Sequence, residues 1–200
     1  MLLPLYNHLL RDNELNMVVR ALQQGKIIVY PTDSVYAFGC DAANRRAVEQ
    51  ICRLRHIEER NPLLALLCDS ISQIRSFTLF NDDTFHLMRS CLPGPYTFIL
   101  QGSSKLPKLY RERRTVGVRI PDLPVVQQLI SAFGSPLMTA SLRTEEGQEV
   151  EYMTDPSLIQ ECYGHDVAFV LDGGIGGTTP SNVIDCTGDE PVVIRGHMPY

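Results

Sequence analysis

The sequence lacks several features that would assign it to a common class of protein. No run approaches ~20 apolar residues, so no membrane-spanning helix is expected. The N-terminus has no basic segment followed by an apolar core, which argues against a signal peptide. There is no Walker A loop, and no helical pattern follows the glycine cluster Gly173–Gly177, so it does not fit the dinucleotide-binding fingerprint. We expect a cytoplasmic protein with no membrane partner.

Metal and nucleophile signatures are also missing. The five histidines are scattered, and none has ligand spacing with another, so no metal site is expected. The six cysteines lie apart and mostly within apolar runs, which favours buried free thiols in a reducing compartment. No serine occupies a nucleophile-elbow pattern, so the sequence does not predict a Ser-His-Asp triad.

Lysine is scarce. Of 18 basic residues only Lys26, Lys105 and Lys108 are lysines. The others are arginines, which bind phosphates and carboxylates through two parallel hydrogen bonds. The formal net charge of -5 gives no overall signature of nucleic-acid binding, but residues 105–119 hold six basic residues and one acid. The run from Lys105 to Arg114 is most often a solvated loop, and an RNA-phosphate patch is the alternative.

Apolar periodicity is the main structural signal that is present. Apolar content is 44% of 200 residues, enough for a sizeable core. Predicted strands are Ile27–Tyr30, Leu63–Cys68, Tyr96–Leu100, Val116–Ile120, Leu137–Ser141, Val167–Leu171, Val183–Cys186 and Val192–Ile194. Predicted helices begin at Asp12 or Asn13, at Asn44, before Phe85, at Val125 and at Pro156, and residues 143–152 are an expected exposed loop. This alternation predicts one α/β domain over residues 1–200, and short connections after Val167 favour antiparallel pairing in a mixed sheet.

Three places could carry chemistry. Thr32, Asp33 and Ser34 follow a buried strand, and ligands bind at strand ends in α/β sheets. A capped strand end is the alternative. Arg53 and Arg55 stand at a helix end, where they either clamp an anion or are solvated. Arg119 lies within a strand between apolar neighbours, so it either faces solvent or lines a polar cleft.

Together these segments resemble the YrdC/YciO family. The motifs that carry the resemblance are Pro31-Thr32-Asp33-Ser34-Val35-Tyr36, Pro93-Gly94-Pro95-Tyr96-Thr97, Val116-Gly117-Val118-Arg119-Ile120-Pro121, Ser181-Asn182-Val183-Ile184-Asp185 and Ile194-Arg195-Gly196. The resemblance implies a single domain, with its core at about 15–195, built on a twisted mixed sheet with a concave basic face. It also implies the activity of the family's synthases. These enzymes convert L-threonine, bicarbonate and ATP into threonylcarbamoyl-AMP and pyrophosphate, for a tRNA modification.

The resemblance assigns a role to particular residues. The implied catalytic residues are Arg53, Arg55 and Ser141. The implied substrate- and nucleotide-binding residues are Thr32, Ser34, Tyr36, Arg119, Arg143, Ser181, Asn182 and Arg195. The implied RNA-binding residues are Lys105, Lys108, Arg111, Arg113 and Arg114. The expected partners are a nucleotide, tRNA or double-stranded RNA, and L-threonine, with ATP as the substrate together with Mg. No covalent intermediate is needed, because positioning and charge neutralisation suffice.

Departures from the synthase pattern resemble the YciO branch. The synthases carry Lys-x-Arg where this chain has Arg53-Leu54-Arg55, and Ser-x-Asn where it has Ser141-Leu142-Arg143. They also carry Gly-Leu in place of Ala37-Phe38. Arginine does not replace lysine conservatively beside a developing charge. We therefore predict weak synthase turnover with nucleotide binding retained. The alternatives are a non-catalytic double-stranded RNA- or tRNA-binding paralogue, and a related reaction on another small molecule.

Overall fold

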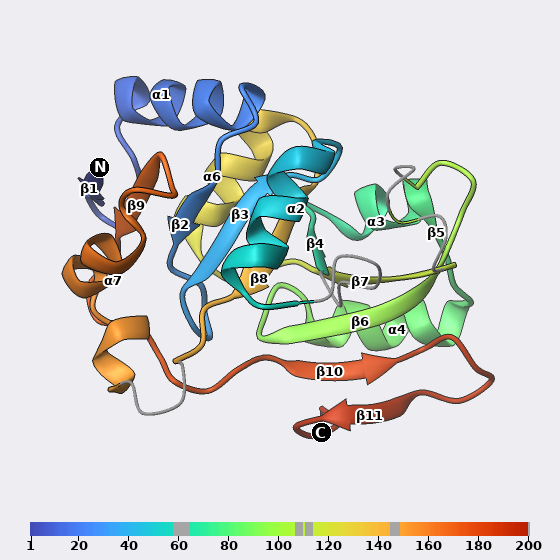
Figure 1. Ribbon diagram of the computed structural model, residues 1–200. Coiled ribbons are helices and arrows are strands. Elements are labelled where there is room, and N and C mark those ends of the chain that lie inside the picture. Colours follow the sequence, from blue (N-terminus) through green and yellow to red (C-terminus); the bar gives the residue numbers. More distant parts are fainter. Residues whose placement is uncertain (58–64, 107–109, 111–113, 145–148, 200) are drawn as a thin grey trace.

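Eleven strands of the described residues join into one mixed sheet, shown in Figure 1. The computed structural model describes residues 1–57, 65–106, 110, 114–144 and 149–199. The sheet order is β1-β9-β2-β3-β8-β4-β7-β6-β10-β11, and β5 pairs with β6 off this path. The strands are β1 (Leu2–Pro4), β2 (Ile28–Tyr30), β3 (Ala37–Asp41), β4 (Ala65–Leu67), β5 (Thr78–Leu79), β6 (Tyr96–Gly102), β7 (Thr115–Arg119), β8 (Leu137–Ser141), β9 (Phe169–Asp172), β10 (Asn182–Asp185) and β11 (Val192–Arg195).

Strand pairing follows the mixed pattern that the sequence predicts, with one correction. The last two strands, β10 and β11, are antiparallel as expected from their short connection. The expectation is wrong for β9 and β10, which are not neighbours. β9 is parallel to both β1 and β2, and β10 is parallel to β6. A long irregular connection, residues 173–181, carries the chain from one part of the sheet to the other.

Local sequence signals explain most helix boundaries. The helices are α1 (Asp12–Gln23), α2 (Arg45–Leu54), α3 (Ile71–Phe77), α4 (Asp82–Cys91), α6 (Pro124–Phe133) and α7 (Pro156–Tyr163). Asn44 caps α2 by accepting the N–H of Ala47 at 3.1 Å, as its side chain predicts. Gly134 ends α6 at φ 75°, a conformation that favours glycine. The predicted N-cap of α1, Asp12 or Asn13, is one or two residues late, since its N-cap is Arg11.

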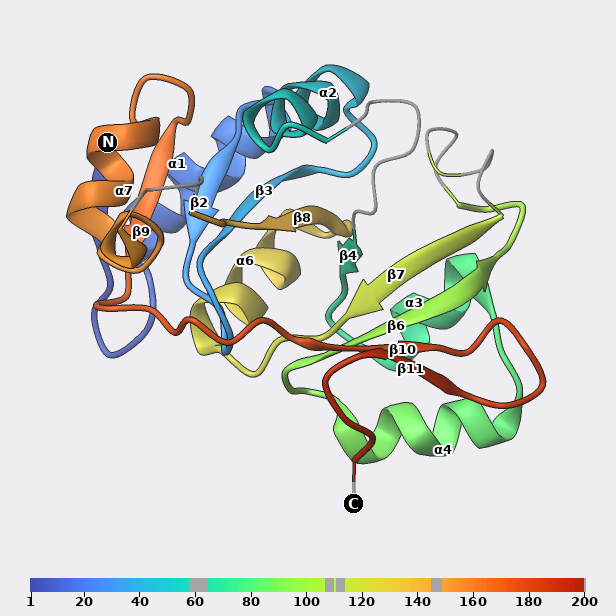
Figure 2. The same ribbon diagram turned by 60° about the horizontal axis from the view of Figure 1, so that its bottom comes forward.

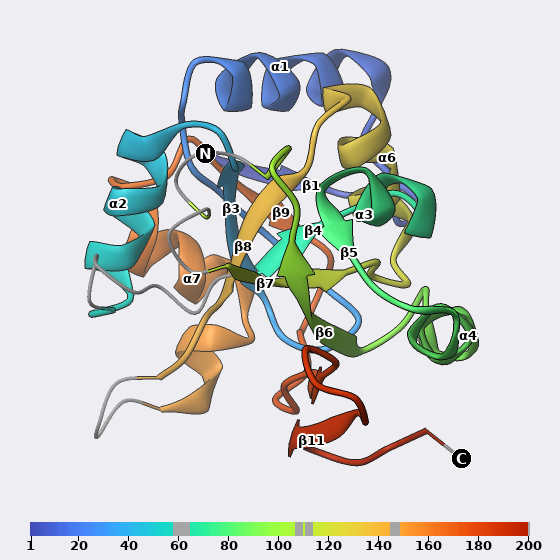
Figure 3. The same ribbon diagram turned by 90° about the vertical axis from the view of Figure 1, so that its right-hand side faces the viewer.

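Helices lie on both sides of the sheet. In Figure 3, α2 and α7 lie on one side and α3, α4 and α6 on the other. Helices α1 and α6 pack on one hydrophobic cluster with β2 and β9, and residues of α2, α3, α4 and α7 join a second cluster. Figure 2 shows the β10–β11 hairpin alongside β6, at the end of the sheet far from β1. The hairpin therefore forms an edge of the sheet.

One sequence-based expectation needs correction, and three short elements escape prediction. Of the expected loop at residues 143–152, residues 145–148 lie outside the described part, and Val150–Met153 form a 3-10 turn that buries Met153. Strands β1 and β5 and helix α3 are too short for periodicity to reveal them. Within the described residues, no helix combines the length and the apolar character needed to cross a membrane.

Candidate functional site

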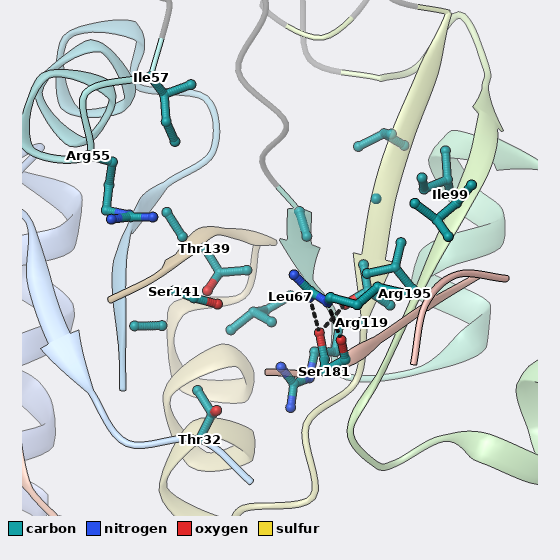
Figure 4. A pocket seen from close by; sticks show the side chains of 18 of the residues that line it. Thr32, Arg55, Ile57, Leu67, Ile99, Arg119, Thr139, Ser141, Ser181 and Arg195 are labelled. Atoms are coloured by element: carbon teal, nitrogen blue, oxygen red, sulfur yellow. Dashed lines mark hydrogen bonds between the residues drawn. The ribbon is translucent and has the colours of Figure 1, made fainter. Parts of the chain in front are cut away.

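A cavity of about 730 Å³ opens over the middle of the sheet, and Figure 4 shows its lining side chains. The lining comes from β3, β4, β6, β7, β8, β10 and β11, with further residues after α2. It consists of Thr32, Ala37, Arg55, His56, Ile57, Ala65, Leu67, Thr97, Ile99, Tyr110, Thr115, Val116, Gly117, Arg119, Thr139, Ala140, Ser141, Arg143, Ser181, Val183, Ile194 and Arg195. Residues far apart in the sequence thus meet at one site large enough for a metabolite.

Strand register builds the floor of this cavity from small side chains. Ala65 on β4 pairs with Thr139 on one side and with Gly117 on the other. Gly117 in turn pairs with Ile99 on β6. A Cβ at Gly117 would lie 3.3 Å from Cβ of Ala65 and 3.4 Å from Cγ2 of Thr97, which is tighter than ordinary packing. Because glycine has no Cβ, this position adds no side chain to the cavity floor and does not crowd its neighbours.

Arg119, at the end of β7, is held by the segment that follows β2. Its Nη2 forms an ion pair with Asp33, and its Nη1 donates to Oγ of Ser34 at 3.1 Å. The other carboxylate oxygen of Asp33 accepts the N–H of Asp122 at 3.0 Å. The Arg119 side chain is only 7% exposed and that of Asp33 12%. Asp33 therefore fixes the guanidinium in place and neutralises its charge.

The hydroxyl protons of Thr32 and Ser34 are both donated within the protein. Thr32 Oγ1 donates to the carbonyl of Val35 at 2.7 Å and accepts the N–H of Ser34 at 3.1 Å. It lies 2.9 Å from Oγ of Ser34, and Ser34 must be the donor there because the proton of Thr32 is already given to Val35. Both hydroxyls thus support Arg119, and neither has a proton left for a ligand.

A second arginine, Arg195 at the end of β11, is held in place by Ser181. Nε of Arg195 donates to the carbonyl of Ser181 at 2.8 Å, and its Nη2 donates to Oγ of Ser181 at 3.3 Å. Oγ of Ser181 also lies 3.1 Å from Oγ1 of Thr97. Burial, followed by the charges of Arg143 and Arg119, lowers the pKa of Arg195. These contacts orient a guanidinium toward the same cavity that Arg119 lines.

Arg55 and Arg143 add two further cations to the lining. Burial lowers the pKa of Arg55, and the charge of Arg143 lowers it further. Nε of Arg55 is buried and has no hydrogen-bond partner in the described part of the chain. No aspartate or glutamate occurs among the described residues that line the cavity. The site is therefore strongly cationic and suited to an anionic ligand.

Tyr36 lies outside the cavity and holds the glycine cluster. Its hydroxyl donates to the carbonyl of Gly174 at 2.8 Å and accepts the N–H of Gly173 at 3.1 Å. Burial raises the pKa of Tyr36 to about 12. A Cβ at Gly176 would lie 2.6 Å from the Tyr36 ring, and one at Gly177 would collide with the carbonyl oxygen of Ser34. The glycines therefore allow the connection after β9 to pack on the segment that supports Arg119.

The structure brings together most of the residues that the sequence singles out for catalysis and for substrate or nucleotide binding. Thr32, Arg55, Arg119, Ser141, Arg143, Ser181 and Arg195 line the cavity, and Ser34 contacts Arg119. Arg53 is exposed and does not line it, because it points away from the face of α2 that carries the buried Val48 and Cys52. Asn182 is also absent from the lining, and its Oδ1 accepts the N–H of His197 at 3.0 Å. Of the predicted RNA-binding residues, Lys105 and Arg114 are exposed, and Lys108, Arg111 and Arg113 lie outside the described residues.

Sequence reasoning misses several residues of the site. It marks Asp33 as part of a polar segment but does not identify it as the partner of Arg119. It also misses Thr97, Thr139 and Ile194. Strand alternation could have predicted two more of them. Thr115 and Gly117 are four and two residues before Arg119, so they face the same side of β7, and they line the same cavity. No group of three or more His, Cys, Asp or Glu side chains among the described residues could hold a metal ion.

The fold and the site define an α/β protein with a cationic, metabolite-sized cavity over a twisted mixed sheet. Comparison with known proteins makes the assignment more specific. The Sua5_yciO_yrdC family model, described as telomere recombination, matches residues 20–197. The chain belongs to this Sua5/YciO/YrdC family.

Individual relatives span most of the chain. YciO of Escherichia coli K12, a protein of uncharacterised function, is 37% identical over 90% of this chain and 87% of its own length. Its crystal structure superposes with a TM-score of 0.87 at 35% identity, covering 98% of this chain and 94% of that one. Threonylcarbamoyl-AMP synthase of Vibrio vulnificus YJ016 is 29% identical over 82% of this chain and 88% of its own length.

One structural relative contains a bound amino acid. Sua5 of P. abyssi complexed with L-threonine matches with a TM-score of 0.83, covering 98% of this chain and 56% of that one. At 24% identity this likeness shows the fold. The family and the fold implied by the sequence motifs are therefore confirmed. The chain is of the YciO type and is related to threonylcarbamoyl-AMP synthase.

Proposed function

We propose that the cavity binds a nucleotide, ATP or AMP, and supports a slow reaction of the threonylcarbamoyl-AMP synthase type. One observation carries this proposal: four arginines line a cavity whose described lining contains no carboxylate. Guanidinium forks match phosphate oxygens in geometry as well as in charge. Because nucleotide phosphates are polyanionic, they are the ligand that best fits this lining.

The cavity also offers a place for the base. Ile99 lines it on the side where Arg195 lies (Figure 4). Val183, which pairs with Arg195, and Ile194, which precedes Arg195 on β11, also line it. Ile194 is 59% exposed on β11, so its apolar surface is available to a ligand. An apolar wall next to fixed cations is the pattern expected of a site that takes a flat, apolar base with a charged tail. The adenine ring would rest on this wall, with the phosphates directed toward Arg119 and Arg195.

The chemistry we propose is one of positioning and charge neutralisation. Arg119, which Asp33 and Ser34 hold rigidly, and Arg195, which Ser181 holds, would fix the phosphates in one geometry. Pre-oriented charges lower a barrier because they need no reorganisation when charge develops. The described lining contains no carboxylate that would ligate Mg²⁺, so we assign no step to the metal, and it would enter with the ATP phosphates.

The relatives suggest an amino acid as the second substrate, and the differences from the synthase motifs suggest slow turnover. One relative is a threonylcarbamoyl-AMP synthase, and another structure holds L-threonine, so an amino acid beside the nucleotide is the natural candidate. One position argues for slow turnover. Arg143, where the synthases carry asparagine, adds a cation to the cavity and so alters the charge around the reacting groups. Arg53, where they carry lysine, lies outside the cavity and leaves its charge unchanged.

The test is incubation of the full chain with ATP, L-threonine and bicarbonate, with pyrophosphate and the adenylate followed by mass spectrometry. We expect slow formation of both products, and faster formation with Arg143→Asn. Arg195→Ala should weaken AMP binding by about 10–100-fold, because it removes a charge-assisted hydrogen bond. Arg46→Ala, which removes an exposed arginine outside the lining, is the matched control. Absence of AMP binding contradicts the proposal.

The alternative is a paralogue that binds double-stranded RNA or tRNA without catalysis. Its motivation is the basic run from Lys105 to Arg114, whose two described members are exposed. Retained nucleotide binding without pyrophosphate formation, combined with salt-dependent RNA binding, would favour this alternative over the synthase.

A further inference from the structure

A row of paired residues across the sheet brings one hydroxyl to the edge of the cavity floor. Thr139 on β8 pairs with Gly39 on β3 and with Ala65 on β4, and Ala65 pairs with Gly117 on β7. Thr139, Ala65 and Gly117 all line the cavity, and Figure 4 shows Thr139 among the lining side chains. Because alanine and glycine carry only a methyl group and a hydrogen atom, the space above them is left to a ligand, and Thr139 borders that space.

Tyr30 occupies the other side of Thr139. A Cβ at Gly39 would lie 2.5 Å from Cε1 of Tyr30, so the tyrosine ring lies over this glycine on its way to Thr139. Tyr30 is fully buried, and its hydroxyl lies 2.6 Å from Oγ1 of Thr139. Burial raises the pKa of Tyr30, so the phenol keeps its proton at neutral pH. A buried proton needs an acceptor, and Oγ1 of Thr139 is the acceptor that the described residues offer.

The direction of this hydrogen bond leaves the proton of Thr139 for another acceptor. A threonine hydroxyl has one proton, and that proton cannot be donated to Tyr30, because the phenol proton already occupies the contact. Among the described residues, no group accepts the proton of Thr139. Thr32 and Ser34 differ in this respect, since both of their protons are donated within the protein. Thr139 therefore offers an oriented O–H donor to a ligand in the cavity that it lines.

We propose that Thr139 is a ligand-binding residue that donates to an oxygen of a planar carboxyl-type group, and that Tyr30 is the positioning residue that orients it. An O–H donor selects an acceptor, so it favours a carboxylate or bicarbonate oxygen over an ammonium group. A planar group is thin enough to lie flat on the floor beside the hydroxyl, where Ala65 and Gly117 add little bulk. This inference rests on the proposed function, in which L-threonine and bicarbonate each carry such a group. It names the residue that recognises that group and leaves the phosphates to the arginines.

The first measurement tests the direction of the hydrogen bond in the full chain. Thr139→Val replaces the hydroxyl with a methyl group and leaves the buried phenol without its acceptor, so the midpoint of urea unfolding should fall. Adding Tyr30→Phe removes the phenol as well and should restore most of the midpoint, because apolar groups of the same shape can replace both partners at little cost. A Thr139→Val chain as stable as the unmodified one, or a double variant no more stable than Thr139→Val, would overturn the arrangement.

The second measurement tests the ligand. Affinities for AMP, L-threonine and bicarbonate come from the rise of the melting temperature with ligand concentration, at constant pH and with potassium chloride keeping the ionic strength equal. In the double variant, affinity for L-threonine or for bicarbonate should fall about tenfold, the effect of one hydrogen bond to a charged group, and affinity for AMP should stay within about twofold. The ligand whose affinity falls identifies the source of the carboxyl-type group.

Further variants separate the two roles. Thr139→Ser keeps the hydroxyl and should retain the affinity that Thr139→Val loses. Thr78→Val, which removes a buried hydroxyl outside the lining, is the matched control and should leave all three affinities unchanged. Tyr30→Phe should weaken binding of the same ligand in the unmodified chain and have no effect once Thr139 is replaced by valine. An equal effect of Tyr30→Phe in both backgrounds would overturn its positioning role.

The remaining outcomes decide the assignment of Thr139. Unchanged affinity for both L-threonine and bicarbonate in the double variant would overturn it, as would a comparable loss of AMP affinity. Undetectable binding of both ligands to the unmodified chain, with and without AMP, would overturn it as well. Failure to bind AMP contradicts the proposed function instead, and the titrations with L-threonine and bicarbonate alone still test Thr139.

Discussion

Removing Asp33 should reveal how much the site depends on its internal ion pair. Asp33→Ala leaves the Arg119 guanidinium, 7% exposed, with Ser34 as its remaining partner among the described residues. Loss of one member of a buried ion pair costs about 3–5 kcal/mol, chiefly because the other charge stays buried and unmatched. The bond to Ser34 remains, so we expect about 3 kcal/mol, measured as the change in free energy of unfolding in urea.

A matched variant separates the ion pair from the backbone contact. Asp172 ends β9 and accepts one backbone N–H, that of Gly174 at 3.0 Å, and no described arginine forms an ion pair with it. Asp33 accepts the N–H of Asp122 at the same distance. Asp172→Ala should therefore cost only about 1 kcal/mol. If Asp33→Ala destabilises the chain no more than Asp172→Ala does, the reasoning about the ion pair is wrong.

Anion rescue gives a second readout of the same variant. In Asp33→Ala, the Arg119 guanidinium lacks its carboxylate, so inorganic phosphate or AMP can supply the missing charge. Either ligand should then raise the melting temperature of the variant more than that of the unmodified chain. Potassium chloride at equal ionic strength is the control, because it screens charge without matching the guanidinium fork.

Four further outcomes follow from the contacts described above. Gly177→Ala should destabilise the fold by about 1–3 kcal/mol by pushing against Ser34, whereas Gly188→Ala, with open space around it, should stay within about 0.5 kcal/mol in the same urea assay. In the unmodified chain the free energy of unfolding should fall as the pH rises above 10, because Tyr36 loses its proton in the unfolded chain at a lower pH than in the folded one. Tyr36→Phe should make this fall smaller, because it removes the phenol. Arg53→Lys should leave pyrophosphate formation unchanged, since its side chain lies outside the cavity. RNA binding through residues 105–114 should weaken with salt at a slope of roughly -0.7 to -0.9 per phosphate contact, and binding indifferent to salt would reject it.

Periodicity and caps predict the longer elements of the fold well. The apolar spacing of α1 and the side chain of Asn44 are enough to identify two helices from the sequence. Sheet order is different, because it depends on which strands pair across long connections. Nothing in the local sequence shows that β9 pairs with β1 and β2 rather than with β10, the next strand along the chain. Very short strands such as Thr78–Leu79 carry too few residues for any pattern.

The candidate site is predictable in part, and the errors have physical causes. Arg119 can be singled out because an arginine between apolar strand neighbours needs a polar surrounding. Arg53 and Arg55 cannot be separated, since only the helix end decides which of them turns to the cavity. The hydroxyls of Thr32 and Ser34 suggest ligand contacts, but only the three-dimensional structure shows that both of their protons are donated within the protein. The motif positions therefore predict where the cavity lies better than they predict the role of each side chain in it.

The C-terminal hairpin gives the site a part that can open. Most of the cavity floor belongs to interior strands, but Ile194 and Arg195 belong to β11, the last strand of the sheet, whose register shifts against β10 between Val183 and Ile184. Edge strands open far more often than interior ones, because fewer contacts hold them. Local unfolding of β11 would remove Arg195 and Ile194 from the cavity wall together. A bound ligand could then leave while the strands of the cavity floor stay folded. Occupancy of the cavity should accordingly slow amide hydrogen exchange in β11 more than in β4 or β7.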